Sequence, residues 1–322
     1  RVGACTVVRD ATLFACSSAN YLNIHIGLLM LLLLLLVPCT HAMSNERWVL
    51  SRRPSGKFRA EDLRLERTEL GDDAPADGNV LVQVEWLSIE AFYRTTFDEE
   101  AYHGSTAVGS IAPALGVGTV LASGSKKFKP GARVVGMLGA QTLALVPAVG
   151  LQAVAALPGL TPTDALGRMG ISGLTAWVGV VAVLRPPRKG EVVVVSAAAG
   201  GVGSIAAQIA KARGARVIGI AGGRAKARFL LNELHLDGAV DYKGDESVGE
   251  QLDKLAPEGV DFFFDNVGGG TLDVVLARIR TGGRIVVCGA VSQYSEGQVN
   301  KGTVHGPRQY LKLAERGATM KG

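Results

Sequence analysis

The stretch that decides the fold runs from residue 191 to residue 212, EVVVVSAAAGGVGSIAAQIAKA. Its first six residues, EVVVVS, form a continuous apolar run that is typical of a strand buried on both faces of a parallel sheet. Residues 202–212 carry apolar side chains at helical spacing. Between them, AAGGVG at 198–203 matches the dinucleotide fingerprint G-x-G-x-x-G with alanine in the first glycine position. This order of strand, glycine-rich turn and helix predicts a dinucleotide-binding βαβ unit.

The spacing of the glycines has a physical cause. Gly200 lets the backbone approach a pyrophosphate, and Gly203 lets the helix close on the strand. The free amides at the start of the helix then receive the negative charge. A tight turn without a ligand is the alternative in a chain with 42 glycines, but the strand before and the helix after the turn favour a cofactor site. The predicted cofactor-binding residues of this turn are Gly200, Gly201, Val202, Gly203 and Ser204.

The residues after the next strand indicate which nucleotide binds. An NAD site places an acidic residue there, to hold the ribose 2'-hydroxyl. This chain has Ala221-Gly222-Gly223 instead, with Arg224 and Lys226 just beyond. Small residues leave room for a 2'-phosphate, and the cations neutralise it, although both could also be ordinary surface charges. We therefore predict NADPH as the cofactor.

The two halves of the chain differ in pattern. In the second half, four more strand candidates alternate with helical segments, so five β units predict a doubly wound parallel sheet. In the first half, short strands separated by Gly and Pro predict a β-rich module that ends near residues 157–162, after which 163–166 opens a helical stretch. The strands expected in the first half are 80–87, 116–122, 133–137 and 143–146, and the further strands of the second half are 216–221, 238–241, 260–264 and 284–288.

Composition sets limits on size and partners. With 322 residues, 48% hydrophobic and 20% charged, the chain can bury two ordinary cores. The net charge of +5 does not indicate a nucleic-acid partner, because Lys and Arg are scattered among 29 acidic residues. After Met43 the only cysteine is Cys288, so neither a disulfide framework nor a Cys-x-x-Cys zinc cluster is expected. We expect metal-free chemistry.

The first 42 residues do not match the rest. The apolar run GLLMLLLLLLV at 27–37 has 11 residues, whereas a membrane helix needs roughly 20. Thr40-His41-Ala42 could serve as a signal-peptide cleavage site, although the flanks are poor. We prefer Met43 as the start of the protein. Residues 1–42 are then upstream sequence outside the fold, and the protein is expected to be cytoplasmic. A secretory or organellar leader is the alternative.

Several motifs resemble one enzyme family. SAAAGGVGS at 196–204, FDNVGG at 264–269 and GRIVVCGAVSQYS at 283–295 are similar to the zinc-free medium-chain dehydrogenase/reductases, in the prostaglandin reductase and alkenal double-bond reductase group. LSIEAFYR at 87–94, FKPGARVVGMLG at 128–139 and GISGLTAW at 170–177 fit the same group. The resemblance covers the chain from Met43 to the end. It implies an α/β protein with a GroES-like catalytic domain at 43–162 and a Rossmann NADPH-binding domain at 163–322.

The resemblance also implies a reaction and a set of residues. Hydride would pass from NADPH to the β-carbon of an α,β-unsaturated aldehyde or ketone, and Tyr294 would donate a hydrogen bond to the carbonyl oxygen as charge develops there. A Tyr that only packs at a strand end is the alternative. Lys226 and Tyr242 would hold the 2'-phosphate, although the stretch between them is one residue longer than the family pattern. The remaining implied contacts, along the nicotinamide half of the cofactor, are Asn266, Cys288, Gly289 and Ala290.

Two departures from the family pattern qualify this reading. Where many members read D-P-Y-M-R, this chain has Glu-Ala-Phe-Tyr-Arg at 90–94, so Phe92 replaces a substrate-lining Tyr. The chain also ends where the family enters its sixth sheet strand, so we expect a C-terminally incomplete sheet that lacks its edge. A quinone reductase of the same superfamily and a cofactor-binding inactive fragment are the alternative functions. The sequence leaves a homodimer open.

Overall fold

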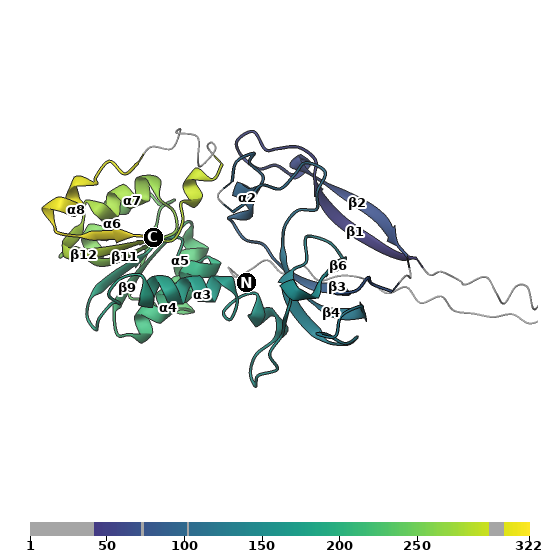
Figure 1. The fold of residues 1–322 in the computed structure, drawn as a ribbon. Helices are drawn as coiled ribbons and strands as arrows, with labels where there is room; N and C mark the ends of the chain where they lie inside the picture. Colours follow the sequence, from purple (N-terminus) through teal and green to yellow (C-terminus); the bar gives the residue numbers. More distant parts are fainter. Residues whose placement is uncertain (1–41, 72–73, 102, 296–305) are drawn as a thin grey trace, which may run out of the picture.

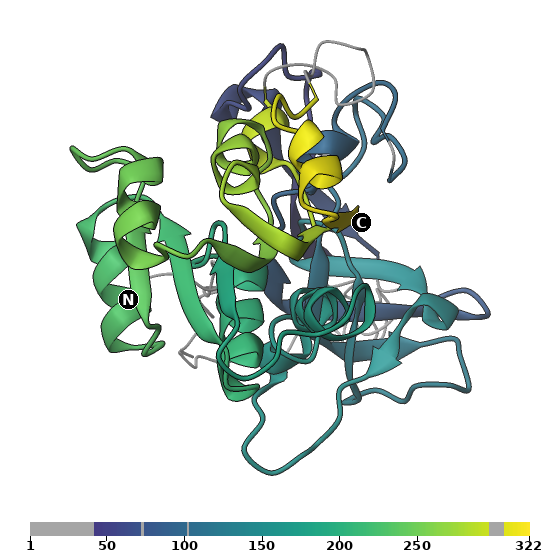
Figure 2. The same cartoon turned by 90° about the vertical axis from the view of Figure 1, so that its left-hand side faces the viewer.

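The computed structural model describes residues 42–71, 74–101, 103–295 and 306–322. The segment expected to be a leader therefore lies outside the described residues, except for Ala42. In the described part of the chain no helix is both long and apolar enough to cross a bilayer. Two parts lie side by side in Figure 1, with the parallel sheet and its helices on the left and the β-rich part on the right. Figure 2 shows the parallel-sheet part in front and the β-rich part behind.

The second half forms one six-stranded parallel sheet of strand order β10-β9-β8-β11-β12-β13. This is the doubly wound order 3-2-1-4-5-6, in which ligands bind outside the carboxyl ends of the central strands. The strands are β8 (Val192–Val195), β9 (Arg216–Ala221), β10 (Gly238–Asp241), β11 (Val260–Asp265), β12 (Ile279–Val287) and β13 (Thr319–Lys321). The helices are α3 (Ile171–Trp177), α4 (Gly201–Ala212), α5 (Arg224–Asn232), α6 (Val248–Leu255), α7 (Gly269–Leu276) and α8 (Leu311–Glu315), with a π-helical turn at Val178–Ala182 after α3.

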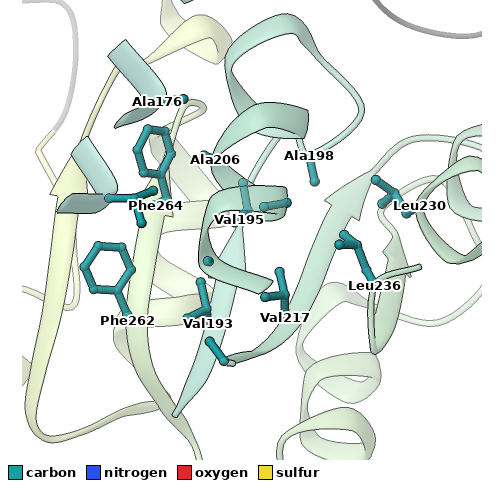
Figure 3. Packing of buried hydrophobic residues seen from close by; sticks show 14 of the residues in the cluster. Ala176, Val193, Val195, Ala198, Ala206, Val217, Leu230, Leu236, Phe262 and Phe264 are labelled. Carbon is teal, nitrogen blue, oxygen red and sulfur yellow. The ribbon is translucent and has the colours of Figure 1, made fainter. Parts of the chain in front are cut away.

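Helices cover both faces of this sheet, as Figure 1 shows. On one face, α3, α4 and α5 pack against the sheet, and Figure 3 shows Val195, Phe264 and Leu230 in that core. On the other face, α6, α7 and α8 pack against side chains such as Val194 and Phe263. All four valines of β8 are buried. In β11 (VDFFFD) every side chain is buried except that of Asp261, which is partly buried. The sheet thus gives the loops at its carboxyl edge a well-packed base.

The first half contains two antiparallel sheets. The larger has the strand order β6-β3-β4-β5-β7 and its own core, which includes Val82, Val120 and Phe128. The smaller is the hairpin-like pair β1-β2. The strands are β1 (Met43–Leu50), β2 (Leu63–Leu70), β3 (Asn79–Ser88), β4 (Leu115–Ser123), β5 (Arg133–Met137), β6 (Leu143–Pro147) and β7 (Gln152–Ala153), and α2 (Tyr93–Thr96) is a single helical turn after β3.

Three features differ from the sequence-based expectation. The sheet is not missing its sixth strand, because β13 pairs in parallel with β12 and Met320 packs on the α6–α8 face. Strand β2 was not predicted, since half of the residues in LRLERTEL are charged and none of them is fully buried in the pair with β1. The helical stretch expected at 163–166 is a 3-10 turn, Pro162–Ala165, and the α-helix begins only at Ile171.

Candidate functional site

The glycine-rich turn leads directly into α4. Gly200 is the N-cap residue, and no side chain caps the helix. The amides of the first helical turn have no partner within a helix, so they can bind an anion. A Cβ on Gly203 would lie 2.3 Å from the carbonyl oxygen of Ala197, whereas a Cβ on Gly201 would only reach the Ser172 hydroxyl at 3.4 Å. Gly203 therefore lets α4 approach the strand, as the fingerprint predicts.

The end of β9 carries no acidic side chain, in agreement with the sequence. A Cβ on Gly222 would lie 2.5 Å from the ring of Tyr242, so the ring rests against the glycine backbone. Tyr242 is nonetheless 56% exposed, which leaves the outer side of its ring free for a ligand. Gly223 has a φ of +93° and caps α5, a conformation that favours glycine. Small residues thus keep the backbone accessible at this corner.

Two cations project from the first turn of α5. Arg224 and Lys226 are exposed, and neither forms an ion pair with a described residue. The nearby carboxylate of Asp241 is occupied, because its Oδ1 accepts hydrogen bonds from the amides of Gly223 at 2.6 Å and Lys243 at 2.9 Å. These backbone bonds hold the pKa of Asp241 below its usual value. The corner is therefore cationic, although no direct contact joins Lys226 to Tyr242.

A buried polar network joins the carboxyl ends of β8 and β11. The Ser196 hydroxyl donates to Asp265 Oδ1 at 2.9 Å and accepts from the Asn266 amide at 2.8 Å. The Asn266 side chain donates to the Ser196 carbonyl at 2.7 Å, which holds it at the sheet edge. Asp265 and Ser196 were not predicted. The available signal was a polar residue at the end of each of two neighbouring apolar strands.

The segment after β12 packs on the loop after β11. The amides of Cys288 and Gly289 donate to the Asp265 carbonyl at 2.7 and 3.1 Å, and the Val291 amide donates to the Asn266 carbonyl at 3.1 Å. Burial, with a smaller effect of Asp265, raises the pKa of the Cys288 thiol to about 11. Cys288 is thus neutral and unreactive near neutral pH.

Tyr294 lies at the end of this segment. Its hydroxyl oxygen is 3.4 Å from the Ala290 amide, and a Cβ on Gly289 would lie 2.9 Å from that oxygen. Burial raises the pKa of Tyr294 above its usual value, so the phenol keeps its proton at neutral pH. The hydroxyl donates to no described residue and can therefore donate to a ligand. Among the sequence-predicted residues, the structure brings the turn, Asn266, Cys288–Ala290 and Tyr294 to one edge of the sheet.

A cavity of about 550 Å³ opens between the starts of α6 and α7. This volume is in the range of small-molecule pockets. It adjoins the loop after β11 and was not predicted from the sequence. Its lining residues are Ser247, Val248, Gly249, Val267, Gly268, Gly270, Thr271, Val274, Arg278 and Ser292.

The β-rich part approaches the same edge. A Cβ on Gly56 would lie 3.6 Å from the carbonyl oxygen of Ser295, and the Arg94 guanidinium holds Gly56 through its carbonyl at 2.9 Å. The Ser172 hydroxyl of α3 lies 3.5 Å from the carboxylate of Glu90, on the loop after β3. Residues of both parts thus meet beside the edge of the parallel sheet.

Within the described ranges, no group of three or more His, Cys, Asp and Glu side chains is arranged to hold a metal ion. The donor set of a zinc centre is not assembled there.

Two family models match the chain. The N-terminal domain of oxidoreductase matches residues 46–154, and the zinc-binding dehydrogenase model matches residues 201–314. Although the second model is named for zinc binding, the described residues of this chain do not form a metal cluster.

Relatives point to one group within that family. The NADPH-dependent curcumin reductase of Escherichia coli is 35% identical over 80% of this chain and 74% of its own. The NADP-dependent 2-alkenal reductase of Nicotiana tabacum is 34% identical over 79% of this chain and 74% of its own. The crystal structure of CurA from Vibrio vulnificus in complex with NADPH superposes with a TM-score of 0.77 at 32% identity, covering 86% of this chain and 81% of CurA. The chain belongs to the medium-chain dehydrogenase/reductase superfamily, among the relatives of NADP-dependent alkenal, curcumin and prostaglandin reductases.

Proposed function

We propose that this protein reduces the carbon–carbon double bond of α,β-unsaturated ketones or aldehydes with NADPH. One observation carries the proposal: an uncapped helix start, two unpaired cations and a protonated phenol are presented along the same edge of one sheet. The relatives that share the fold and the motifs include a curcumin reductase and a 2-alkenal reductase, both NADP-dependent.

The residues present fit a phosphorylated dinucleotide. The free amides at the start of α4 suit the pyrophosphate, with Gly200 and Gly203 giving it room. Arg224 and Lys226 suit the 2'-phosphate, since neither forms a salt bridge with a described residue, although the charge of Asp241 acts on Arg224 at longer range. Tyr242 offers a ring face beside them. Asn266, Cys288, Gly289 and Ala290, at the carboxyl ends of β11 and β12, would contact the nicotinamide half.

The chain's own residues then set up the chemistry. NADPH, when bound, supplies the hydride that reaches the β-carbon of the substrate. The Tyr294 phenol donates a hydrogen bond to the substrate carbonyl oxygen, which gains negative charge as the hydride arrives. The α-carbon of the resulting enolate then takes a proton from water. Since its pKa is raised by burial, Tyr294 stays protonated and able to donate across the neutral range. Loops of the β-rich part, among them the one that carries Gly56, help to exclude water from this edge.

The first test concerns the cofactor. Fluorescence titration should show NADPH binding at least tenfold more tightly than NADH, a gap of about 1.4 kcal/mol. Lys226→Ala should remove most of that preference by weakening NADPH alone. Lys211→Ala is the matched control, because Lys211 lies in the last turn of α4 and is already paired with Asp237 at 2.9 Å. Equal affinities for the two nucleotides would refute the NADPH assignment.

The second test concerns the reaction. With a simple alkenone, NADPH oxidation should yield the saturated ketone, which chromatography separates from the allylic alcohol. A quinone of similar size serves as the competing acceptor. Faster turnover of the quinone than of the alkenone would favour the quinone reductase alternative instead. The homodimer and the cytoplasmic location stay predictions. Light scattering would test the first, and fractionation of cells would test the second.

A further inference from the structure

One buried residue joins the three segments that meet at the carboxyl edge of the parallel sheet: its carboxylate bonds to two of them and its main-chain carbonyl to the third. Asp265 ends β11 and has no exposed surface. Its Oδ1 atom accepts hydrogen bonds from the Ser196 hydroxyl at 2.9 Å, the Val267 amide at 3.0 Å and the Gly268 amide at 3.1 Å. Its Oδ2 atom lies 3.1 Å from the same Gly268 amide. Its carbonyl oxygen accepts from the amides of the two residues that follow β12, at 2.7 and 3.1 Å.

The Ser196 hydroxyl extends this bonding to the start of the phosphate turn. It donates to Asp265 and accepts from the Asn266 amide at 2.8 Å, so both of its hydrogen-bonding roles are used. Ser196 is the last residue before the turn, and its carbonyl is held by the Asn266 side chain at 2.7 Å. The orientation of the carboxylate is thereby transmitted to the backbone that leads into the turn.

The carboxylate differs from another on the same strand. Asp261, at the amino end of β11, accepts from the Val192 amide of β8 at 2.8 Å and is neutralised by Arg280 at 3.2 Å. Asp265 has hydrogen-bond donors but no ion pair with any described residue. A buried carboxylate without a cation is costly, and a hydrophobic residue would make a simpler strand end. Unlike a hydrophobic residue, Asp265 accepts hydrogen bonds from Ser196 and from the loop after β11.

We infer that Asp265 is a positioning residue for the cofactor: its carboxylate fixes the phosphate turn through Ser196 and fixes the loop after β11 through the amide of Gly268. The inference rests on the proposed NADPH site. It extends that proposal to a side chain that need not touch the ligand.

The test uses Asp265→Asn, which keeps the size of the side chain but places an N–H group among N–H donors. At a temperature below the melting transition that calorimetry gives for each variant, Asp265→Asn should weaken NADPH binding about tenfold, a change of about 1.4 kcal/mol. Asp261→Asn is the matched control, with the same substitution on the same strand, and should stay within twofold of the wild type. If Asp265→Asn also stayed within twofold, the inference would fail while the wild-type affinity still upheld the NADPH site. A wild-type protein without NADPH affinity would overturn both.

Two further readouts separate positioning from general support of the fold. Ser196→Ala should also cost about tenfold, and the double variant should cost little more than either single one, because both act through the same hydrogen bond. A hundredfold loss in the double variant would contradict the route through Ser196.

The pH dependence is the second readout. Burial raises the pKa of Asp265 above 3.8. The thiol of Cys288 and the phenol of Tyr294 are neutral throughout the acid range, because their pKa values are ordinarily far above it and burial raises them further. The ratio of wild-type to Asp265→Asn affinity cancels the titration of NADPH itself. That ratio should fall toward one as pH drops through the raised pKa of Asp265, and a ratio that did not change with pH would count against the inference.

Discussion

Replacing Gly203 with Ala tests the close approach of α4 to the strand. A Cβ at this position would lie 2.3 Å from the carbonyl oxygen of Ala197 and 2.9 Å from its carbonyl carbon. Both atoms are backbone, so no side-chain rotation relieves the overlap. Because ordinary contact begins near 3.4 Å, α4 has to move away from the turn by about 1 Å.

The cost follows from two opposing effects. Overpacking a close contact typically costs about 1 to 3 kcal/mol, and a contact between backbone atoms lies at the upper end. Replacing Gly by Ala within a helix recovers about 1 kcal/mol. The expected net loss is about 2 kcal/mol, which lowers the melting temperature of a unit of this size by roughly 4 to 8 °C. NADPH affinity should fall as well, since the displaced amides no longer converge on the phosphate.

Differential scanning calorimetry and NADPH titration on the same preparations measure both effects. Gly270→Ala is the control for stability, because Gly270 is also in the first turn of a helix but has no atom within 4 Å of the added Cβ. That variant should melt at or slightly above the wild-type temperature. If Gly203→Ala melted with the wild type and bound NADPH equally well, the argument that this glycine exists for close packing would be wrong.

Three further predictions follow from the site and its surroundings. Tyr294→Phe should lower the single-turnover rate of enone reduction by about tenfold to a hundredfold while NADPH affinity stays unchanged, and an unchanged rate would leave Tyr294 as a packing residue. Although burial raises the pKa of Glu191, hydrogen bonds from Arg185, the Arg188 amide and Arg284 outweigh it and lower the pKa to about 2. The stability that this carboxylate contributes is complete above pH 4.5 and is lost as pH falls toward 2. In Glu191→Gln, the free energy of unfolding measured across that window should therefore fall by roughly 1 to 2 kcal/mol less than in the wild type. Exhaustive chelation should leave activity unchanged, and activity that returned only on adding zinc would contradict the expected metal-free chemistry.

Periodicity predicted the parallel sheet well, for reasons visible in its strands. EVVVVS and VDFFFD each contain a continuous apolar run, a pattern typical of a central strand in a sheet that is covered on both faces. The third residue of β9, Ile218, is likewise fully buried. By contrast, β2 was missed because charged residues alternate with leucines that are partly buried or exposed, so no side chain of the strand is fully buried. The domain boundary at residue 162 remains a prediction.

The site was predicted less completely than the fold. The turn residues and the cations of α5 follow from local spacing, which sequence reports directly. Asp265 and Ser196 were missed because their role depends on a pairing across 69 positions, which only the assembled sheet reveals. The cavity between α6 and α7 was missed for the same reason. The sixth strand was expected to be absent because the chain ends where the family pattern enters it, yet the three residues of β13 are enough to pair with β12.

The distribution of charge pairing distinguishes the two ends of the parallel sheet. At the amino end, Arg284 is held by Glu191 at 2.6 Å, and Asp261 is held by Arg280 at 3.2 Å. Such pairs neutralise charge that serves only the fold. At the carboxyl end, Lys226 has no partner in the described chain, α4 has no cap, and Asp265 is satisfied by backbone and hydroxyl donors alone. Amides left without acceptors and cations without a salt bridge to a described residue give this edge an attraction for a phosphorylated ligand.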